Sequence, residues 1–270
     1  MKNWPATLCL FFTWAALAES QPLTLYTESF PPYNFEEHNQ PTGINTEIVE
    51  TLCKHAKLKC VIQVLPWRRA MSKTLEQPYS GIFSTSRTTL REAQFQWVGP
   101  LVSGQPCLYR LSERTDIELT SSRLLTNYTI GVSRGDVYQA VLTDLQLVEG
   151  HHFLTYSGKF EELNMFKRGK HDLLIGSSMT LATQLQKVAL NPDQVIPVLE
   201  LNHPALGGNY LALNKSAPAS VVSALQRALD TMKENGQIAP IVEKFVPANK
   251  YPHVQTSPTV DRCFYGTAVY

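Results

Sequence analysis

The chain has 270 residues, of which 43% are hydrophobic and 17% charged, a composition typical of a folded globular protein with a substantial core. Its formal net charge is +1, with no basic run and no acidic tail, which argues against nucleic acid or an anionic membrane surface as the main partner. The length allows one large domain or two of ordinary size.

The first 18 residues have the pattern of a cleaved signal peptide. Lys2 supplies a positive charge, residues 8–17 are mostly apolar, and Ala16-Leu17-Ala18 forms a small-x-small cleavage site before Glu19. The apolar stretch is shorter than the ~20 residues that a membrane-spanning helix requires. We therefore expect export to the periplasm with removal of residues 1–18.

Four of the five cysteines lie beyond the expected signal peptide, and export would place them in an oxidising compartment. Cys53 and Cys60 flank a helix-to-strand turn, and we expect a disulfide between them. A metal site there would need more ligands than the neighbouring His55 offers, so we expect no metal. Cys107 and Cys263 either pair or stay free, because four cysteines allow three connectivities.

Strand and helix patterns alternate through the first half of the chain. A strand is predicted at 23–26, and the prolines within 30–33 end it because proline cannot donate to the ladder. Apolar residues at four-residue spacing then predict a helix over 44–56, preceded by Gly43. Further strands are predicted at 61–64 and 81–84.

The second half repeats this alternation. A helix is predicted from Pro218 to Asn235-Gly236, since proline favours the first helical turn and glycine the position after the end. After Pro247 the sequence becomes irregular, and we expect residues 247–270 to form a poorly ordered tail. The other predicted elements are strands at 129–132, 172–176, 195–198 (an edge strand) and 210–213, and a helix over 238–245.

Alternating strands and helices predict mainly parallel sheets covered by helices on both faces. Ligands of such sheets bind beyond the carboxyl ends of the strands. This rule places four segments on candidate ligand-facing turns: 30–33, Trp67, 84–91 and Gly135-Asp136.

An ordered set of motifs resembles the family 3 extracellular solute-binding proteins, which include the polar amino-acid receptors of bacterial ABC importers. The resemblance covers roughly residues 22–246, and the run Pro66-Trp67-Arg68-Arg69-Ala70 resembles a proteobacterial branch with a Pro-Trp-Arg-x-Ala motif. The matching stretches are Phe30-Pro31-Pro32-Tyr33, Gly43 with its helix, Cys53-x6-Cys60, Pro66-Trp67, Ser84-x-Ser86-x-Thr88-x-x-Arg91, and Gly131-Val132-x-x-Gly135.

The resemblance implies an α/β, periplasmic-binding-protein-like fold, in which two lobes are joined by a two-strand hinge. Lobe 1 would comprise residues 22–105 and 208–246, and lobe 2 residues 106–207. Such lobes close around a ligand by rigid-body motion. The resemblance also implies a monomer without a cofactor, and a membrane ABC permease as partner.

In similar receptors, the arginine that matches Arg91 grips the ligand carboxylate. Its planar guanidinium presents a fork of donors that suits a carboxylate, whereas the motif-free interpretation is a surface arginine at a helix start. Ser84, Ser86 and Thr88 lead up to Arg91. Their hydroxyl and backbone N–H groups would complete an anion-binding surface, or else only end a strand and cap a helix.

Two aromatic residues, Trp67 and Phe30, are candidate walls of the site, although core packing is the usual role of such residues. One position departs from the amino-acid receptors, because Ser177 stands where an aspartate binds the ligand ammonium. A neutral hydroxyl does not compensate a buried ammonium. We expect Asp136 or Glu28 to substitute; otherwise the ligand is not an α-amino acid.

Three alternatives remain open from the sequence. One is a receptor that feeds a signalling partner. Another is an enzyme, because cyclohexadienyl dehydratases resemble this family, with Glu28, Asp136 and Glu161 as candidate acids and bases. A third is a family member that binds only a protein partner. No Ser-His-Asp set or phosphate loop stands out, so we expect a binding protein and no enzyme.

Overall fold

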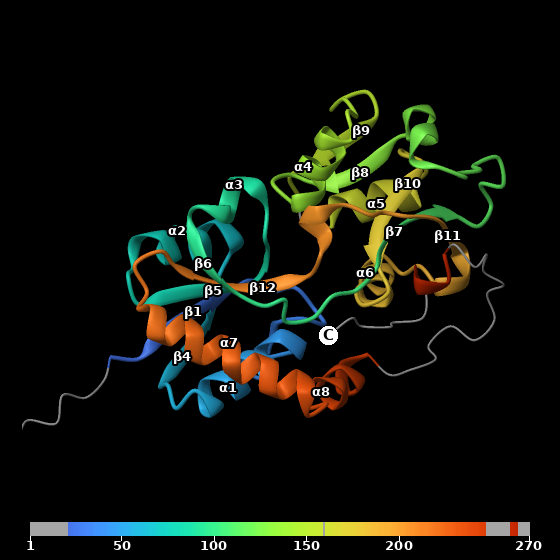
Figure 1. The fold of residues 1–270 in the computed structure, drawn as a ribbon. Helices are drawn as coiled ribbons and strands as arrows, with labels where there is room; N and C mark the ends of the chain where they lie inside the picture. The colour runs from blue at the N-terminus through green and yellow to red at the C-terminus, as the bar shows by residue number, and fades with distance from the viewer. Residues whose placement is uncertain (1–20, 159, 247–259, 264–270) are drawn as a thin grey trace, which may run out of the picture.

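The structure is a computed structural model that describes residues 21–158, 160–246 and 260–263. The predicted signal peptide and most of the predicted tail lie outside these residues. Two five-stranded sheets with flanking helices form two lobes (Figure 1). No helix in the described part of the chain is long and apolar enough to cross a membrane.

The first lobe contains a sheet with strand order β4-β1-β5-β12-β6 and a small hairpin of β2 and β3. Its strands are β1 (Leu23–Thr27), β2 (Phe35–Glu37), β3 (Gln40–Thr42), β4 (Cys60–Val64), β5 (Ser80–Ser86), β6 (Phe95–Val98) and β12 (Asn209–Asn214). Its helices are α1 (Ile44–His55), α2 (Trp67–Glu76), α3 (Thr89–Glu92), α7 (Ala219–Glu234) and α8 (Ile238–Phe245).

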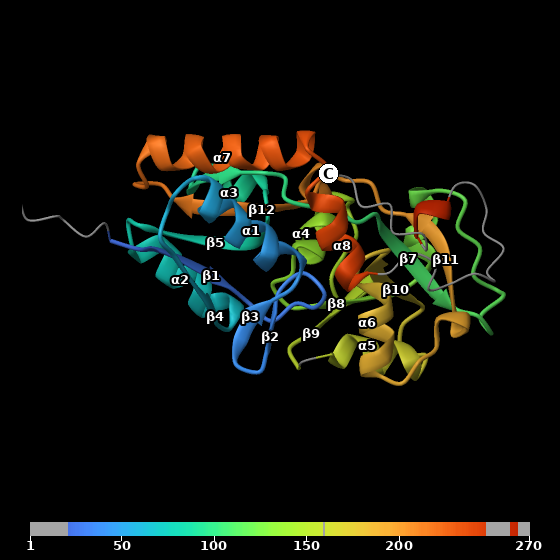
Figure 2. The same ribbon diagram turned by 90° about the horizontal axis from the view of Figure 1, so that it is seen from below.

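Helices α1, α7 and α8 cover one face of the first sheet, and α2 covers the other (Figures 1 and 2). The four-residue spacing predicted for α1 is buried as expected, since Ile44, Ile48 and Leu52 are fully enclosed. Gly43 precedes α1 with φ +114°, and a Cβ there would lie 2.6 Å from the carbonyl oxygen of Tyr33. Only glycine permits this approach of the FPPY turn to the helix.

The second lobe contains a sheet with strand order β11-β7-β10-β8-β9. Helices α5 and α6 cover one face and α4 the other. Its elements are β7 (Pro106–Leu111), β8 (Ile130–Ser133), α4 (Val137–Asp144), β9 (Phe153–Tyr156), α5 (Glu161–Lys167), β10 (Leu173–Ser177), α6 (Leu181–Lys187) and β11 (Val195–Glu200). Short 3-10 turns occur at 122–127, 192–194, 204–206 and 261–263.

The prediction of mainly parallel sheets is wrong, because both sheets are mixed. β1 pairs in parallel with β4 and β5, and β8 with β9 and β10. In contrast, β12 is antiparallel to β5 and β6, and β7 is antiparallel to β10 and β11. The physical reason is that β7 and β12 each begin where the chain enters a lobe from the other one, and so run away from the interlobe side.

Two segments, 99–105 and 201–208, carry the chain between the lobes and run side by side (Figure 1). Leu101 N donates to Asn209 O at 2.7 Å and Asn209 N donates to Val102 O at 3.0 Å. Leu201 N donates to Pro106 O at 2.8 Å. These backbone bonds make the crossing a two-stranded connection, which is the geometry of a hinge.

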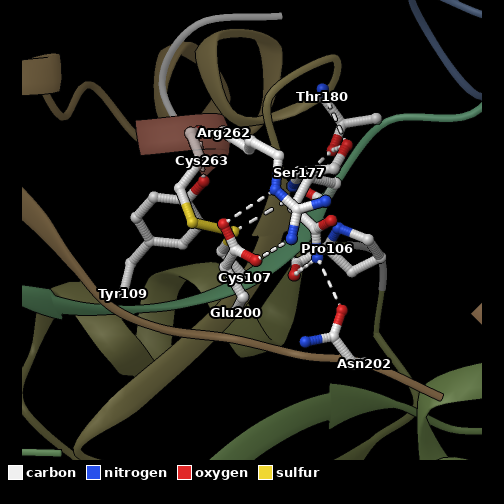
Figure 3. Close-up of a disulfide and its surroundings, with 10 residues drawn as sticks. Pro106, Cys107, Tyr109, Ser177, Thr180, Glu200, Asn202, Arg262 and Cys263 are labelled. Atoms are coloured by element: carbon white, nitrogen blue, oxygen red, sulfur yellow. Dashed lines mark hydrogen bonds and ion pairs between the residues drawn. A yellow bond between two sulfur atoms is a disulfide. The ribbon is translucent and has the colours of Figure 1, made fainter. Parts of the chain in front are cut away.

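Two disulfides are present among the described residues. The predicted Cys53–Cys60 bridge is confirmed. Cys107 and Cys263, whose state the sequence left open, are also bonded, across 156 positions of the chain. Figure 3 shows this second bridge where the C-terminal segment meets β7, with the Tyr109 hydroxyl donating to the Cys263 carbonyl at 2.6 Å.

The prediction of a poorly ordered tail is wrong for residues 260–263. Val260 and Cys263 are buried in the apolar core of the second lobe. Arg262 forms an ion pair with Glu200 at the end of β11, beside the start of the second crossing (Figure 3). The rest of the predicted tail lies outside the described residues. The C-terminal segment is therefore anchored to the second lobe although α8, which precedes it, belongs to the first.

Candidate functional site

Three charged residues, Glu28, Arg91 and Asp136, form what we call the interlobe cluster. Glu28 follows β1, Arg91 lies in α3 directly after β5, and Asp136 follows β8 and precedes α4. Each therefore lies just beyond the carboxyl end of a strand, as the rule for open α/β sheets predicts. Asp136 of the second lobe interacts electrostatically with both Glu28 and Arg91 of the first.

Arg91 is held in place without a carboxylate partner. Its Nη1 donates to the Ser86 carbonyl at 3.3 Å, and its guanidinium carbon lies 5.1 Å from the centroid of the Trp67 ring. Among the described residues it forms no ion pair within 4 Å. Its neighbour Arg87 is instead locked by two hydrogen bonds to Glu92, at 2.6 and 2.7 Å. Burial lowers the pKa of Arg91.

The two acids of the cluster are poised to bind protons. Burial raises the pKa of Glu28 to about 7, the negative charge of Asp136 adds to this rise, and Arg91 opposes it. The pKa of Asp136 is also raised, mainly by desolvation, while backbone N–H groups of α4 and the charge of Arg91 lower it. Asp136 stays accessible to water, so solvent screens this interaction.

A fourth acid, Glu162, lies at the start of α5 and interacts electrostatically with Asp136. Its Oε2 atom is buried without a hydrogen-bond partner among the described residues. Desolvation raises its pKa, and a hydrogen bond from Ser133 lowers it. The surroundings of Arg91 are therefore acidic on the side of the second lobe. Sequence reasoning missed Glu162, and its place in the first turn of a helix gave only the usual signal of an acid at a helix start.

The two candidate aromatic walls lie on different sides of the FPPY turn and α2. Trp67 is the first residue of α2, is partly buried, and packs beside the cluster that contains Tyr26 and Ala70. Phe30 is 38% exposed, and its ring centroid lies 5.4 Å from that of Tyr33. Trp67 is brought to Arg91, whereas Phe30 is brought to Tyr33.

The three hydroxyl residues before Arg91 have different surroundings. Ser84 has φ +60°, donates its hydroxyl hydrogen to Asn34 Oδ1, and accepts from Asn45 Nδ2 at 2.8 Å. It belongs to a polar group inside the first lobe. Ser86 offers its carbonyl to Arg91. Thr88 precedes α3, where its carbonyl accepts the N–H of Arg91 at 3.0 Å.

Ser177 ends β10 and is only 5% exposed. Its hydroxyl lies 3.1 Å from that of Thr180 and accepts the Thr180 N–H at 3.3 Å. Asp172, at the other end of the strand, accepts from Thr129 and pairs with Arg114 at 2.8 Å, a structural role that the sequence already suggested. Neither residue joins the interlobe cluster.

Other features of the described residues are a cavity of about 320 Å³ at the hinge and the absence of any metal-binding cluster. The cavity is lined by both crossing segments and Arg262, and by none of the interlobe cluster. No group of three or more His, Cys, Asp or Glu side chains within these residues is placed to hold a metal ion.

The geometry of two hinged α/β lobes with opposed charged groups agrees with a comparison against known families. The profile of the bacterial extracellular solute-binding proteins, family 3, matches residues 23–248. The chain belongs to this family. A comparison with curated proteins gives no significant match.

Solved structures similar to this family 3 protein share its fold at low sequence identity. A histidine kinase sensor domain with similarity to periplasmic binding proteins has a TM-score of 0.69 and 14% identity, over 84% of this chain and 96% of that one. A structure from work on glutathione import in Streptococcus mutans gives 0.69 and 17%, over 86% and 98%. An arginine-specific periplasmic binding protein of Salmonella typhimurium gives 0.65 and 16%, over 84% and 100%.

Proposed function

We propose that this family 3 protein is a non-enzymatic periplasmic receptor for a small ligand with a carboxylate, an amino acid or a related polar acid, and that it delivers this ligand to a membrane ABC permease. The observation that carries the proposal is the interlobe cluster. Arg91 of one lobe interacts electrostatically with Asp136 of the other, and it has no ion-pair partner among the described residues.

A carboxylate suits Arg91 for two reasons. The guanidinium has lost part of its hydration, and its position over Trp67 leaves the planar fork of donors in a fixed orientation. A carboxylate would restore the lost interactions through two parallel N–H···O bonds. Charge-assisted hydrogen bonds each contribute about 1.5–3 kcal/mol. Ser86 and Thr88 remain proposed contacts through their backbone and hydroxyl groups, and Phe30 a proposed wall.

A positively charged group on the same ligand would suit the acids around Arg91. Burial favours the protonated form of Glu28 and of Asp136 in the absence of ligand. An ammonium or guanidinium close to either acid would favour the ionised form instead. This complementarity supports an amino acid, and arginine-bound and lysine-bound proteins are among the solved structures of similar fold.

The proposal includes export, the lobe boundaries and a monomeric state. Cleavage after residue 18 would release a protein whose lobes comprise residues 22–105 with 208–246 and residues 106–207. Membership of an extracellular family and two disulfides support an oxidising compartment. A receptor that feeds a sensor would use the same site, and the likeness to a histidine kinase sensor domain supports keeping this second candidate.

An enzyme on this fold would need a paired acid and base beside the ligand. Of the three candidates, Glu161 uses its carboxylate to accept the N–H of Gly158 at 2.9 Å. Glu28 and Asp136 are then the only pair left of those the sequence offered. We propose that they bind charge and perform no proton transfer, so incubation with prephenate-like acids is expected to give no turnover. Turnover lost in Glu28→Gln and Asp136→Asn would establish the enzyme instead.

A thermal-shift screen tests the receptor function. Purified protein is heated with separate amino acids, dicarboxylates and amines, because a ligand that binds the folded state raises the melting temperature by mass action. We expect a carboxylate-bearing compound to raise it, and Arg91→Ala to abolish the shift. Arg87→Ala is the matched control, because Arg87 pairs with Glu92 on the surface. A response only to amines without a carboxylate, or an unchanged response of Arg91→Ala, would contradict the proposal.

A further inference from the structure

The turn that follows β10 enters the interior of the first lobe. Met179 in this turn is 2% exposed, and it belongs to the same apolar cluster as Val98, Leu211 and Tyr33 of the first lobe. No other residue of β7 to β11 or their connections is named in that buried cluster. Met179 is thus a side chain of the second lobe that is buried in the core of the first.

The turn also rests directly on the first crossing segment at Gly104. A Cβ at this position would lie 2.5 Å from Cγ of Met179 and 3.2 Å from the hydroxyl oxygen of Ser177. Because Cβ atoms essentially never approach another heavy atom so closely, only glycine admits this contact. The hinge and the turn are therefore packed against each other without space for water.

A polar contact joins the lobes at the same place. The Tyr33 hydroxyl, from the FPPY turn of the first lobe, is within hydrogen-bonding reach of the side chains of Ser177 and Asn209. Tyr33 is 4% exposed. The Ser177 hydroxyl also interacts with the Thr180 side chain and accepts its N–H. One donor and two acceptor positions are the whole capacity of a hydroxyl, so these partners use all of it.

We propose that Tyr33, Ser177 and Met179 form an interlobe latch, which stabilises the arrangement in which the lobes touch, and that Ser177 affects ligand affinity through this arrangement without contacting the ligand. If lobe 2 rotates away, the phenol loses Ser177 and Met179 leaves its apolar surroundings. The predicted effect on lobe arrangement is independent of what the protein binds. The predicted effect on affinity rests on the proposed receptor function.

The latch changes affinity by changing the population of the closed form. The apparent dissociation constant rises as the fraction of binding-competent protein falls. Loss of one buried neutral hydrogen bond changes an equilibrium about fivefold. Tyr33→Phe keeps the ring in its apolar cluster and removes only the hydroxyl. We therefore expect this variant to shift the equilibrium about fivefold toward the open form.

Small-angle X-ray scattering of the ligand-free protein tests the latch directly. We expect Tyr33→Phe and Met179→Ala each to raise the radius of gyration. The matched control is Tyr26→Phe, which removes a buried hydroxyl that bonds Gln77 within the first lobe and is expected to leave scattering unchanged. Circular dichroism confirms that each variant is folded. If the latch variants scatter like the wild type, the proposal is wrong.

Ser177→Asp separates a latch from a ligand contact, with L-arginine as the probe in surface plasmon resonance. A residue that touched the ligand's ammonium would bind it more tightly as an aspartate, whereas a latch residue would bury an unpaired carboxylate and weaken binding. We expect weaker binding, and about fivefold weaker binding for Tyr33→Phe through faster dissociation. Tighter binding by Ser177→Asp overturns the latch. If L-arginine does not bind the wild type, the proposed ligand class is wrong, while scattering still tests the latch.

Discussion

Replacing Glu28 by glutamine should stabilise the ligand-free protein at high pH and leave it unchanged at low pH. Desolvation, aided by the charge of Asp136, raises the pKa of Glu28 from 4.5 to about 7 in the folded protein. Between these two values the folded state binds more protons than the unfolded state, so the stability decreases as the pH rises. The shift corresponds to at most about 3 kcal/mol, since each unit is about 1.4 kcal/mol.

The sign of this effect distinguishes Glu28 from most surface acids. Below pH ~4.5 both states carry a protonated carboxyl, and glutamine is a neutral replacement of the same shape. Above pH ~7 the wild type must keep a poorly solvated carboxylate next to Asp136, which the variant does not. Water reaches Glu28 in part, because the residue is only partly buried, so the measured gain should fall below the upper limit.

Urea unfolding of the ligand-free protein at pH 5 and pH 8 measures this difference. We expect Glu28→Gln to exceed the wild type by 1 to 3 kcal/mol at pH 8, on the scale of about 1.4 kcal/mol per pKa unit. The difference should be much smaller at pH 5. The exposed Glu36 provides a control substitution, Glu36→Gln. A Glu28→Gln variant that is less stable than wild type at pH 8, or equally shifted at both pH values, would refute the reasoning.

Three further predictions concern the second lobe. Burial lowers the pKa of His171 from 6.5 to about 4, so the unfolded state binds its proton first and stability should fall by about 3 kcal/mol as the pH drops from 6.5 to 4; His171→Gln should flatten this part of a pH–stability curve. Gly131→Ala should cost about 1–3 kcal/mol in urea unfolding, because its Cβ would lie 2.2 Å from the His171 ring, whereas Gly207→Ala should be nearly neutral. Removing the Cys107–Cys263 bridge by a double alanine substitution should lower stability by up to about 5 kcal/mol, since it closes a loop of 156 positions; a loss below ~1 kcal/mol would contradict the chain-entropy argument.

Local patterns were enough to predict the strands of the sheets and the helices with long apolar faces. The four-residue spacing in α1 and the proline and glycine limits of α7 are such patterns, and both helices formed as predicted. Pro197 correctly indicated that β11 lies at a sheet edge. The short helices α4, α5 and α6 were not predicted, because seven or eight residues carry too few repeats for a period to emerge.

Features that depend on distant parts of the chain were not visible in the sequence. The directions of β7 and β12 follow from where the chain crosses between lobes, so alternation alone predicted parallel pairing wrongly. The pairing of Cys107 with Cys263 depends on the return of the C-terminus to the second lobe. Ser84 looked like part of the anion site by spacing, yet its positive φ directs its hydroxyl to Asn34 and Asn45.

Arg91 illustrates what motif and structure each contribute. The motif predicted an arginine for a carboxylate, and this role stays a prediction. The structure adds the neighbours that make the role physically reasonable: the ring of Trp67, the carbonyl of Ser86, and the opposed charges of Glu28 and Asp136. None of these four is within eight positions of Arg91 except Ser86, so their convergence required the fold.

A double comparison by isothermal titration calorimetry tests the central claim most directly. The amino acid that raises the melting temperature most is titrated into wild type and Arg91→Ala, and so is its carboxamide, which lacks only the negative charge. We predict that wild type binds the acid at least about 100-fold more tightly than the amide, as two charge-assisted hydrogen bonds imply, and that Arg91→Ala binds both with similar low affinity. If Arg91→Ala keeps the preference for the acid, Arg91 does not hold the ligand's carboxylate.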